Sequence, residues 1–311
     1  EVDSMRILLT GGSGMVGKNI LEHPASRRHE LLAPSSREMN LLDRASTFEF
    51  VQKTKPDLVI HCAGRVGGIQ ANMAHPVAFL IENLDMARNV IGAAAEAGVP
   101  KLLNMGSSCM YPRNAPNPLT EDLVLKGELE PTNEGYAIAK VFAARFGSYL
   151  MRERKELQYK TLLPCNLYGR HDKFDPKHSH LIPAVIHKVH MAKKESEPHV
   201  EIWGDGEARR EFMDAVDLAD FVYFALDRFN DLPELTNVGL GFDHSINDYY
   251  RAVAKVIGYT GPFQHDLTKP VGMKQKLVSV DQASRMGWKA STSLEAGIKK
   301  AYEFYLGLQE K

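Results

Sequence analysis

The sequence has few cysteines, no long apolar run and almost no net charge, and each absence excludes a class of protein. Three cysteines in 311 residues, none in CxxC spacing, argue against a disulfide framework and against a zinc site. No apolar run approaches the roughly 18–20 residues that a helix needs to span a bilayer. Lys and Arg number 38 and Asp and Glu 39, so the formal net charge of −1 does not indicate nucleic acid or a membrane surface as a partner.

The remaining composition is that of an ordinary globular protein, with 44% hydrophobic and 25% charged residues. The length suits a catalytic core of roughly 100–200 residues with a smaller second lobe. We find no internal repeat and no signal peptide. We interpret Glu1–Ser4, which precede Met5, as a remnant of the expression vector, and we expect a cytoplasmic protein.

Short apolar runs alternate with helical patterns over the first half of the chain. The apolar runs predict strands at Met5–Thr10, His29–Pro34, Leu58–Ala63, Leu102–Met105 and Lys160–Leu163. Helical patterns run from the first glycine cluster to about Glu22, over Asn72–Gly98 and over Glu134–Lys155. This order predicts an α/β fold of the Rossmann type, with a doubly wound parallel sheet. We expect a dinucleotide-binding domain at residues 5–168. Residues 169–311 would form mainly a smaller substrate lobe, interleaved with late elements of the core.

A glycine cluster lies between the first predicted strand and the first predicted helix. It consists of Gly11, Gly12, Ser13, Gly14, Met15, Val16 and Gly17 and has GxxGxxG spacing. Glycine permits a tight turn and lets the backbone approach a pyrophosphate, and the helix N-terminus offers free N–H groups to the anion. In this position the cluster predicts a dinucleotide-binding loop.

The end of the second predicted strand indicates which dinucleotide is bound. An NAD site usually has Asp or Glu there, whereas this chain reads Pro34-Ser35-Ser36-Arg37 with no acid before Glu38. Ser36 and Arg37 could hold the 2′-phosphate of NADP(H), so we predict NADPH as the cofactor. The alternative for Arg37 is an ordinary solvated charge.

Two further motifs supply reactive groups. Tyr136 and Lys140 form YxxxK near the start of a predicted helix, where the i, i+4 spacing places both on one face. A nearby ammonium would lower the pKa of the tyrosine, which could then exchange a proton as hydride moves. Ser107, at the end of the fourth predicted strand, could orient the substrate oxygen. The alternatives are a surface Tyr and Lys, and a serine that caps a turn.

These motifs, in this order, resemble the extended short-chain dehydrogenase/reductases. Longer stretches resemble the GDP-L-fucose synthase branch of that family: Val66–Ile69, Gly106–Pro112 (GSSCMYP), Glu130–Lys140 (EPTNEGYAIAK), Pro164–Asp172 (PCNLYGRHD), Ser179–Pro183 (SHLIP), Trp203–Gly206 (WGDG) and Arg210–Phe212. The resemblance covers nearly the whole chain from Met5.

The resemblance implies a 3,5-epimerisation followed by reduction of a 4-keto group. Cys109 matches the family's base and His180 its acid at C3 and C5 of GDP-4-keto-6-deoxy-D-mannose. Hydride from NADPH would then reduce C4 while Tyr136 supplies a proton, giving GDP-L-fucose. Ser107 would orient the oxygen, and Lys140 would tune Tyr136 and hold the nicotinamide ribose. A thiolate is a suitable base for a carbon acid if its pKa falls towards neutrality.

The resemblance also implies binding residues and an assembly. Besides the glycine loop, Ser36 and Arg37, the implied cofactor contacts are Lys140, Pro164, Asn166, Leu167 and His180. The implied substrate contacts are Ser108, Asn166, Lys188, Trp203, Arg210 and Lys276. A homodimer would pair the helices around Asn72–Gly98 and Glu134–Lys155 across a two-fold axis. No metal is expected.

The sequence departs from the family pattern at two positions. Val271 stands where the family commonly has Asp in Pro-Asp-Gly, which leaves the sugar open. Ser13 stands where the family often has Arg, so binding of the 2′-phosphate would depend more on Ser35, Ser36 and Arg37.

Other functions remain open at this point. One is the same chemistry, or 4-reduction alone, on a related GDP-4-keto-6-deoxy sugar such as a heptose. A second is a 4,6-dehydratase or 4-epimerase that retains NAD, although a dehydratase would carry Thr-Asp-Glu where this chain has Ser107-Ser108-Cys109. A third is a dinucleotide sensor without catalysis, although such proteins typically lack the Tyr or the Lys.

Overall fold

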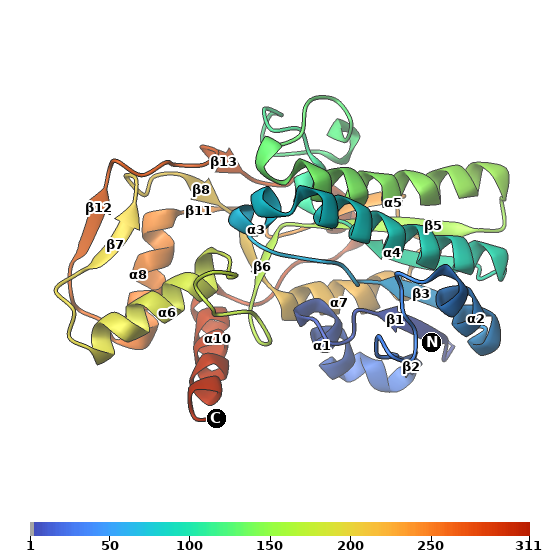
Figure 1. Cartoon of the computed structure of the whole chain (residues 1–311), viewed down its shortest axis with the longest axis horizontal. Coiled ribbons are helices and arrows are strands. Elements are labelled where there is room, and N and C mark those ends of the chain that lie inside the picture. Colours follow the sequence, from blue (N-terminus) through green and yellow to red (C-terminus); the bar gives the residue numbers. More distant parts are fainter. Residues whose placement is uncertain (1–2) are drawn as a thin grey trace.

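Six strands pair in one parallel sheet, in the order β10-β5-β4-β3-β1-β2, in the computed structural model, which describes residues 3–311 (Figure 1). Their bounds are β1 Arg6–Thr10, β2 Glu30–Leu32, β3 Leu58–His61, β4 Lys101–Met105, β5 Gln158–Pro164 and β10 Leu235–Val238. The interpretation of Glu1–Ser4 falls partly on residues 1–2, which lie outside the described part.

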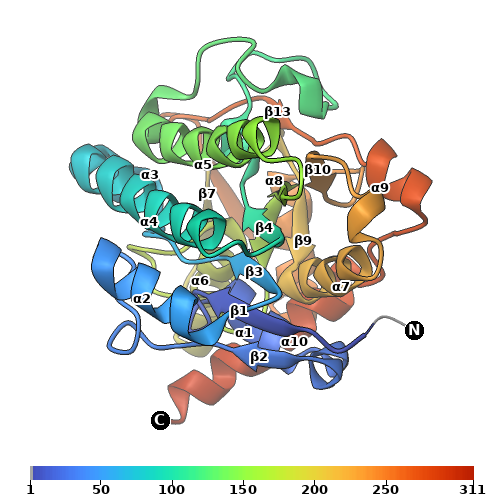
Figure 2. The ribbon, with the colours of Figure 1, turned by 90° about the vertical axis from the view of Figure 1, so that its right-hand side faces the viewer.

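Helices cover both faces of this sheet (Figure 2). The helices are α1 Met15–Glu22 and α7 Ala215–Leu226 on one face, and α2 Arg44–Thr54, α4 Pro76–Glu96 and α5 Glu134–Glu153 on the other. Side chains alternate along each strand, so Ile7 and Leu9 enter the core under α7 while Leu8 enters the core under α4. The predicted doubly wound parallel sheet is therefore confirmed.

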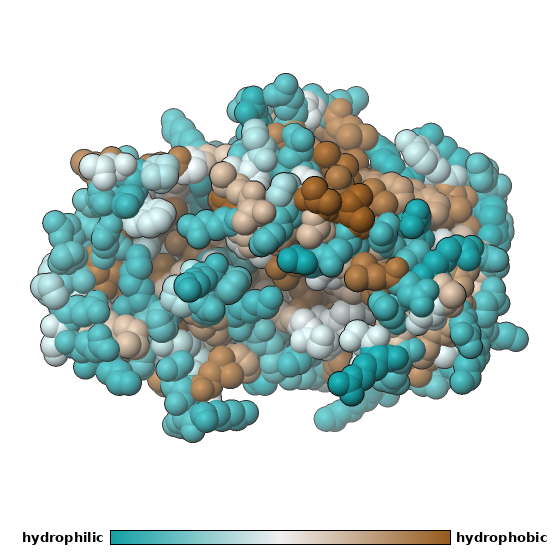
Figure 3. Space-filling model, viewed as in Figure 1, coloured by the Kyte–Doolittle hydropathy of each residue, from teal (hydrophilic) through white to brown (hydrophobic). Residues whose placement is uncertain are grey.

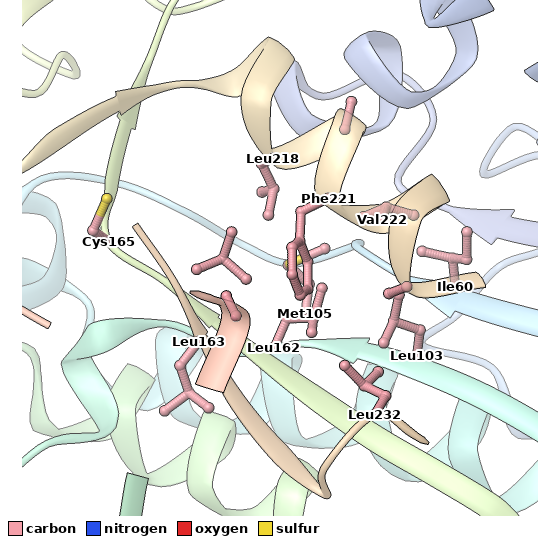
Figure 4. Close-up of a cluster of buried hydrophobic side chains, with 14 of the residues drawn as sticks. Ile60, Leu103, Met105, Leu162, Leu163, Cys165, Leu218, Phe221, Val222 and Leu232 are labelled. Atoms are coloured by element: carbon pink, nitrogen blue, oxygen red, sulfur yellow. The ribbon is translucent and has the colours of Figure 1, made fainter. Parts of the chain in front are cut away.

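The core under α7 packs aromatic and aliphatic side chains from sheet and helix (Figure 4). Phe221 of α7 is fully buried in the same cluster as Leu103 of β4 and Leu162 of β5, and its ring meets Trp288 edge to face at 5.0 Å between ring centres. Close packing of this kind makes each buried group costly to remove. The core fixes α7, which comes from the second half of the chain, onto the first-half sheet.

A second lobe packs three helices around its own core (Figure 1). The helices are α6 Leu181–Lys194, α8 Ile246–Ile257 and α10 Leu294–Gln309. The α8 helix begins at a capping box between Ser245 and Asp248 and ends at Gly258, whose φ of 80° suits glycine. Because β10 and α7 lie with the large sheet, the C-terminal half contributes to both lobes. A domain boundary between residues 168 and 169 stays a prediction.

The remaining elements are short. They are α3 Ile69–Ala74, α9 Asp281–Met286, β6 Asn166–Tyr168, β7 Val200–Trp203, β8 Arg209–Arg210, β9 Phe212–Asp214, β11 His244–Ser245, β12 Phe263–Asp266 and β13 Gln275–Lys276. They form the small sheets β11-β8-β13, β12-β7 and β6-β9. Within residues 3–311, none of the helices combines the length and the apolar character that crossing a bilayer requires.

One predicted helix was wrong and one helix was not predicted. The single helix predicted over Asn72–Gly98 is two helices, because the chain turns at His75 and Pro76 starts α4 afresh. The α2 helix was missed because it is polar, with only Thr47 and Val51 buried, although Asp43 caps it by accepting a hydrogen bond from Ala45 N at 3.0 Å.

The core makes a prediction about stability. Phe221→Ala should lower the free energy of unfolding by about 3–5 kcal/mol, because it removes a fully buried ring and leaves a cavity. Phe242→Ala is the matched control, since Phe242 is 55% exposed and should cost less than about 0.5 kcal/mol. Urea unfolding followed by fluorescence measures both, and equal losses would contradict the packing described here.

Candidate active site

The carboxyl ends of the parallel strands meet along one edge of the sheet, and the predicted reactive groups follow them. The β1 strand pairs with β2 on one side and with β3 on the other, so the strand order reverses beside β1. Crevices for ligands form at such a reversal. The glycine loop, residues 11–17, leaves β1 at this point.

The loop is built by close backbone contacts that only glycine allows. Gly11 has a φ of 73°, and a Cβ there would lie 2.6 Å from Ala63 N. A Cβ on Gly17 would lie 2.1 Å from the Gly11 carbonyl oxygen. Gly14 is the N-cap of α1 and has no side chain to cap it, so the first N–H groups of α1 remain available to an anion. These features fit the pyrophosphate of a dinucleotide.

The end of β2 carries no acidic side chain that is free to hold a ribose. The Glu38 carboxylate accepts a hydrogen bond from Ser35 N at 3.0 Å, within its own turn. Ser36 and Arg37 are both exposed beside it. A hydroxyl and a guanidinium at this place fit a 2′-phosphate, which is the group that distinguishes NADP from NAD.

Ser107, Tyr136 and Lys140 come together where β4 ends against α5. Ser107 starts the short helical turn η2 (Ser108–Met110) and its Oγ accepts a hydrogen bond from Cys109 N at 3.3 Å. Lys140 Nζ donates to the Met105 carbonyl at 3.0 Å and lies 5.4 Å from the centre of the Tyr136 ring. The predicted trio therefore shares one corner of the sheet edge.

The pKa of Tyr136 differs from what the motif predicts. Burial raises the pKa of Tyr136 above its usual value, and the Cys109 thiolate acts in the same direction. The lowering of the pKa that the motif predicts is therefore not seen, although the Lys140 ammonium lies near the ring. Burial also lowers the pKa of Lys140 itself.

Cys109 is a buried free thiol at the same corner. Burial raises its pKa, against the opposing effects of the hydrogen bond involving Ser107 and the ammonium groups of Lys276 and Lys140. The pKa of the thiol is thus raised, whereas the mechanism expected from the sequence requires it to fall towards neutrality for the thiolate to be populated. The hydrogen bond involving Ser107 and the two lysines favour its thiolate.

His180 lies in the second lobe, where it is the N-cap of α6 and is exposed. Partial desolvation by surrounding atoms lowers the pKa of its imidazole, and Lys276 and Lys173 lower it further. Lys276 therefore acts electrostatically on both Cys109 and His180. A lowered pKa makes a protonated imidazole a stronger acid.

Arg210 and Lys276 stand side by side in the small sheet, because β8 and β13 pair in the register Lys276 to Arg210. Burial lowers the pKa of both cations. Lys276 also lines a pocket with Ser108 and Cys109. Two adjacent cations of this kind suit an anionic ligand such as a diphosphate.

Lys188 and Trp203 do not join this cluster in the same way. Lys188 Nζ donates to the Glu201 carbonyl at 2.8 Å and to the Tyr250 hydroxyl at 3.2 Å, so it links α6 with β7 and α8. Trp203 ends β7 with 53% of its surface exposed, and Lys269 lies over its ring at 5.3 Å. Val271 packs against Gly204, the residue that follows Trp203.

The remaining implied contacts lie where β5 passes into β6. Pro164 is buried and pairs with Val238, while Asn166 and Leu167 are half-buried in β6 beside β9. They thus follow a strand end on the same edge as the glycine loop.

The sequence interpretation missed Glu211, which has a role in shaping the site. Its carboxylate is 1% exposed and accepts hydrogen bonds from Leu240 N at 2.7 Å, Gly241 N at 2.9 Å and Val278 N at 3.1 Å. Burial raises the pKa of Glu211 to about 7, against the effect of these bonds. Because Glu211 follows Arg210, and Val278 lies two residues from Lys276, it ties the two cationic strands together. The signal available in the sequence was the acidic residue inside the Arg210–Phe212 stretch.

The glycine loop predicts two distinguishable defects. Gly17→Ala should lower both the melting temperature and the affinity for NADPH, because its Cβ would overlap the Gly11 carbonyl oxygen. Gly14→Ala should retain the melting temperature of the parent, since the nearest atom to its Cβ lies 3.6 Å away. It should weaken NADPH binding, because the pyrophosphate of the cofactor approaches the protein backbone in such a loop. Thermal melts and fluorescence titration with NADPH measure these effects, and full NADPH affinity in both variants would contradict the assignment of the loop.

Comparison with known proteins agrees with this geometry. Residues 7–239 match the NAD dependent epimerase/dehydratase family. The chain is 51% identical to GDP-L-colitose synthase of Yersinia pseudotuberculosis, over 97% of this chain and 98% of that protein. It is 44% identical to GDP-L-fucose synthase of Azorhizobium caulinodans, over 97% of this chain and 96% of that protein.

A solved structure with NADP bound, the GDP-mannoheptose C4 reductase from Campylobacter jejuni, superposes with a TM-score of 0.87 at 30% identity, over 98% of this chain and 99% of that chain. The predicted resemblance to GDP-L-fucose synthases is confirmed by relatives of that name. The chain belongs to the NAD dependent epimerase/dehydratase family.

Proposed function

We propose that this protein is an NADPH-dependent epimerase/reductase that converts GDP-4-keto-6-deoxy-D-mannose to GDP-L-fucose. The observation that carries the proposal is the position of Cys109, which lies beside Ser107 and shares a pocket with Lys276. A simple reductase needs only Ser107, Tyr136 and Lys140 and has no use for a thiol there. The relatives named fucose synthase support the same activity.

Epimerisation requires a base and an acid on the two sides of the sugar ring. The 4-keto group acidifies the protons at C3 and C5, and Ser107 holds its oxygen. Cys109 removes each proton as thiolate, the form that the ammonium of Lys276 favours. His180 comes from the other lobe and returns a proton to the opposite face.

Reduction at C4 uses the same corner of the sheet. NADPH, when bound, supplies the hydride. Tyr136 donates a proton to the C4 oxygen, and the nearby Lys140 ammonium stabilises the phenolate that remains. Burial raises the pKa of Tyr136, so the phenol stays protonated until it donates its proton to the C4 oxygen.

The residues at the end of β2 support NADPH as the cofactor. Ser36 and Arg37 are exposed there, while Glu38 is engaged with Ser35. The C. jejuni neighbour has NADP bound. We propose a cytoplasmic site of action, in keeping with three cysteines that all remain free thiols.

A second candidate is GDP-L-colitose formation, favoured by the 51% identity to a protein of that name. Colitose is the 3-deoxy counterpart of fucose, so only the configuration at C5 would change. The C. jejuni GDP-mannoheptose C4 reductase supports 4-reduction of a related GDP-heptose as a third. Val271 stands where the family commonly has Asp, so these sugars remain candidate substrates.

Heavy water separates these activities. Incubation with NADPH and GDP-4-keto-6-deoxy-D-mannose in D2O should oxidise NADPH and yield a product with deuterium at C3 and C5. Cys109→Ser and His180→Gln should each lower deuterium incorporation about 10²–10⁴-fold, and Cys109→Ser should retain the NADPH Kd. Tyr136→Phe should retain the deuterium exchange and lose NADPH oxidation.

The other outcomes decide against the proposal in different ways. NADPH oxidation without deuterium would leave a plain 4-reductase and remove the roles of Cys109 and His180. No reaction with this substrate, together with turnover of the 3-deoxy sugar, would establish the colitose candidate. Turnover of a GDP-4-keto-heptose alone would establish the third.

We also propose a homodimer formed through α4 and α5, which pack side by side. Figure 3 shows an apolar patch over the N-terminal parts of these helices and α3. Its exposed residues are Met73, Val77, Ile81 and Ile138, with Val77 72% exposed. A two-fold axis would bury the same patch on both copies.

The dimer is tested by placing charge in the patch. Val77→Glu should shift the protein from dimer to monomer in sedimentation at micromolar concentration, because the carboxylate would be buried without a partner. Leu267→Glu is the matched control, since Leu267 is 74% exposed in the other lobe. A monomeric parent protein, or an unchanged dimer in Val77→Glu, would contradict this interface.

A further inference from the structure

Asn237 of β10 lies at the centre of a buried hydrogen-bond network that the mechanism above does not use. The residue is 1% exposed, and β10 is an edge strand of the large sheet. Its Oδ1 accepts a hydrogen bond from the Tyr111 hydroxyl at 2.5 Å. Its Nδ2 donates to the Leu119 carbonyl at 2.9 Å and to the Ser279 carbonyl at 3.0 Å. These four residues, which we call the amide network, join three segments that are distant in the sequence.

One of these segments carries Cys109. Tyr111 follows the turn η2 directly, and its backbone N–H donates to the Ser108 carbonyl at 3.2 Å. The Tyr111 side chain is buried and lines the same pocket as Cys109. The bond from its hydroxyl to Asn237 therefore fixes the end of the turn on which Cys109 stands.

The other two segments lie beside each other directly after Lys276. Leu119 N donates to the Leu277 carbonyl at 2.8 Å, and Ser279 N donates to the Leu119 carbonyl at 2.8 Å. The Oδ1 of Asn117 accepts a further hydrogen bond from Leu277 N at 2.7 Å. These bonds fix the chain that follows Lys276, and the amide network then joins this chain to the large sheet.

The relative position of Cys109 and Lys276 matters because the lysine ammonium favours the thiolate. The other groups that act with this thiol are Ser107, two residues before it, and Lys140 and Tyr136 on α5, which packs against η2. Lys276 differs from them, since it comes from the C-terminal half of the chain. The amide network is a buried connection between its segment and the turn.

We propose that Asn237 is a positioning residue, which holds the turn of Cys109 and the strand of Lys276 in a fixed relation. Its consequence for catalysis rests on the proposed function, in which Cys109 is the base. Asn237 acts through Tyr111 and Leu119, which line the pocket. A small misplacement of reacting groups lowers a rate strongly, so loosening the amide network should slow proton removal.

The test uses Tyr111→Phe, which removes one hydroxyl from the amide network and retains the ring. Asn237→Ala would break all three bonds at once and endanger the fold. Tyr159→Phe is the matched control, because Tyr159 is also buried and its hydroxyl donates to the Val99 carbonyl at 2.8 Å, in a different core cluster. Each variant loses one buried hydrogen bond, so both melting temperatures should fall by similar amounts.

Deuterium incorporation into GDP-4-keto-6-deoxy-D-mannose, measured in D2O with NADP+ so that no hydride is transferred, separates positioning from stability. Only Tyr111→Phe should lower its rate, by about 2- to 10-fold. The rate should rise with pH through the pKa of the Cys109 thiol, because the thiolate is the base. Since Lys276 then favours the thiolate less, this rise should move to higher pH in Tyr111→Phe, whereas Tyr159→Phe should retain the pH profile of the parent.

Alkylation of Cys109 by iodoacetamide, followed by mass spectrometry of its peptide, gives the pH profile of the thiol without substrate. It should show the same move to higher pH in Tyr111→Phe. An unchanged profile in that variant, or an equal shift in Tyr159→Phe, would overturn the inference and assign the amide network to stability alone. A parent protein that incorporated no deuterium, together with a shifted alkylation profile, would overturn the proposed function and still support the placement of the thiol by Asn237.

Discussion

The parallel pairing of the central sheet is the constraint on which the rest of the structure depends. Because its strands run in one direction, their carboxyl ends lie along one edge, and the segments that leave them converge. The glycine loop after β1, Ser107 after β4 and Asn166 after β5 are far apart in sequence yet share this edge. Helices on both faces shield the sheet, so the edge is where ligands can reach the backbone.

Glu211 is the polar counterpart of that constraint in the second lobe. Its buried carboxylate holds three backbone N–H groups from two segments, and this fixes Lys276 beside Arg210. Lys276 in turn acts on Cys109 and His180, which come from different lobes. One carboxylate thus holds in place the strand of the cation that affects the pKa of both Cys109 and His180. Burial opposes ionisation at this corner, since it raises the pKa of Cys109 and of Tyr136.

Much of this arrangement could be predicted from local sequence patterns. The β1 strand, the glycine turn and α1 follow from an apolar run, GxxGxxG spacing and a helical pattern, all of which act over a few residues. The i, i+4 spacing of Tyr136 and Lys140 likewise places both on one face of α5. The polar helix α2 could not be predicted in this way, because it does not clearly follow an apolar periodicity. The break at His75 could not be predicted either, because it does not clearly interrupt that periodicity.

The sequence by itself therefore determined the parallel α/β fold and the glycine turn between β1 and α1, and it named the candidate reactive groups. Only the tertiary structure decided that Lys188 links α6 to β7 and α8, that the charge of Lys276 acts on both Cys109 and His180, and that Cys109 and Lys276 line one pocket. The reason is physical: strand and helix periodicity are local properties of the chain. Burial, hydrogen-bond partners and pKa values are set by atoms that come from distant segments.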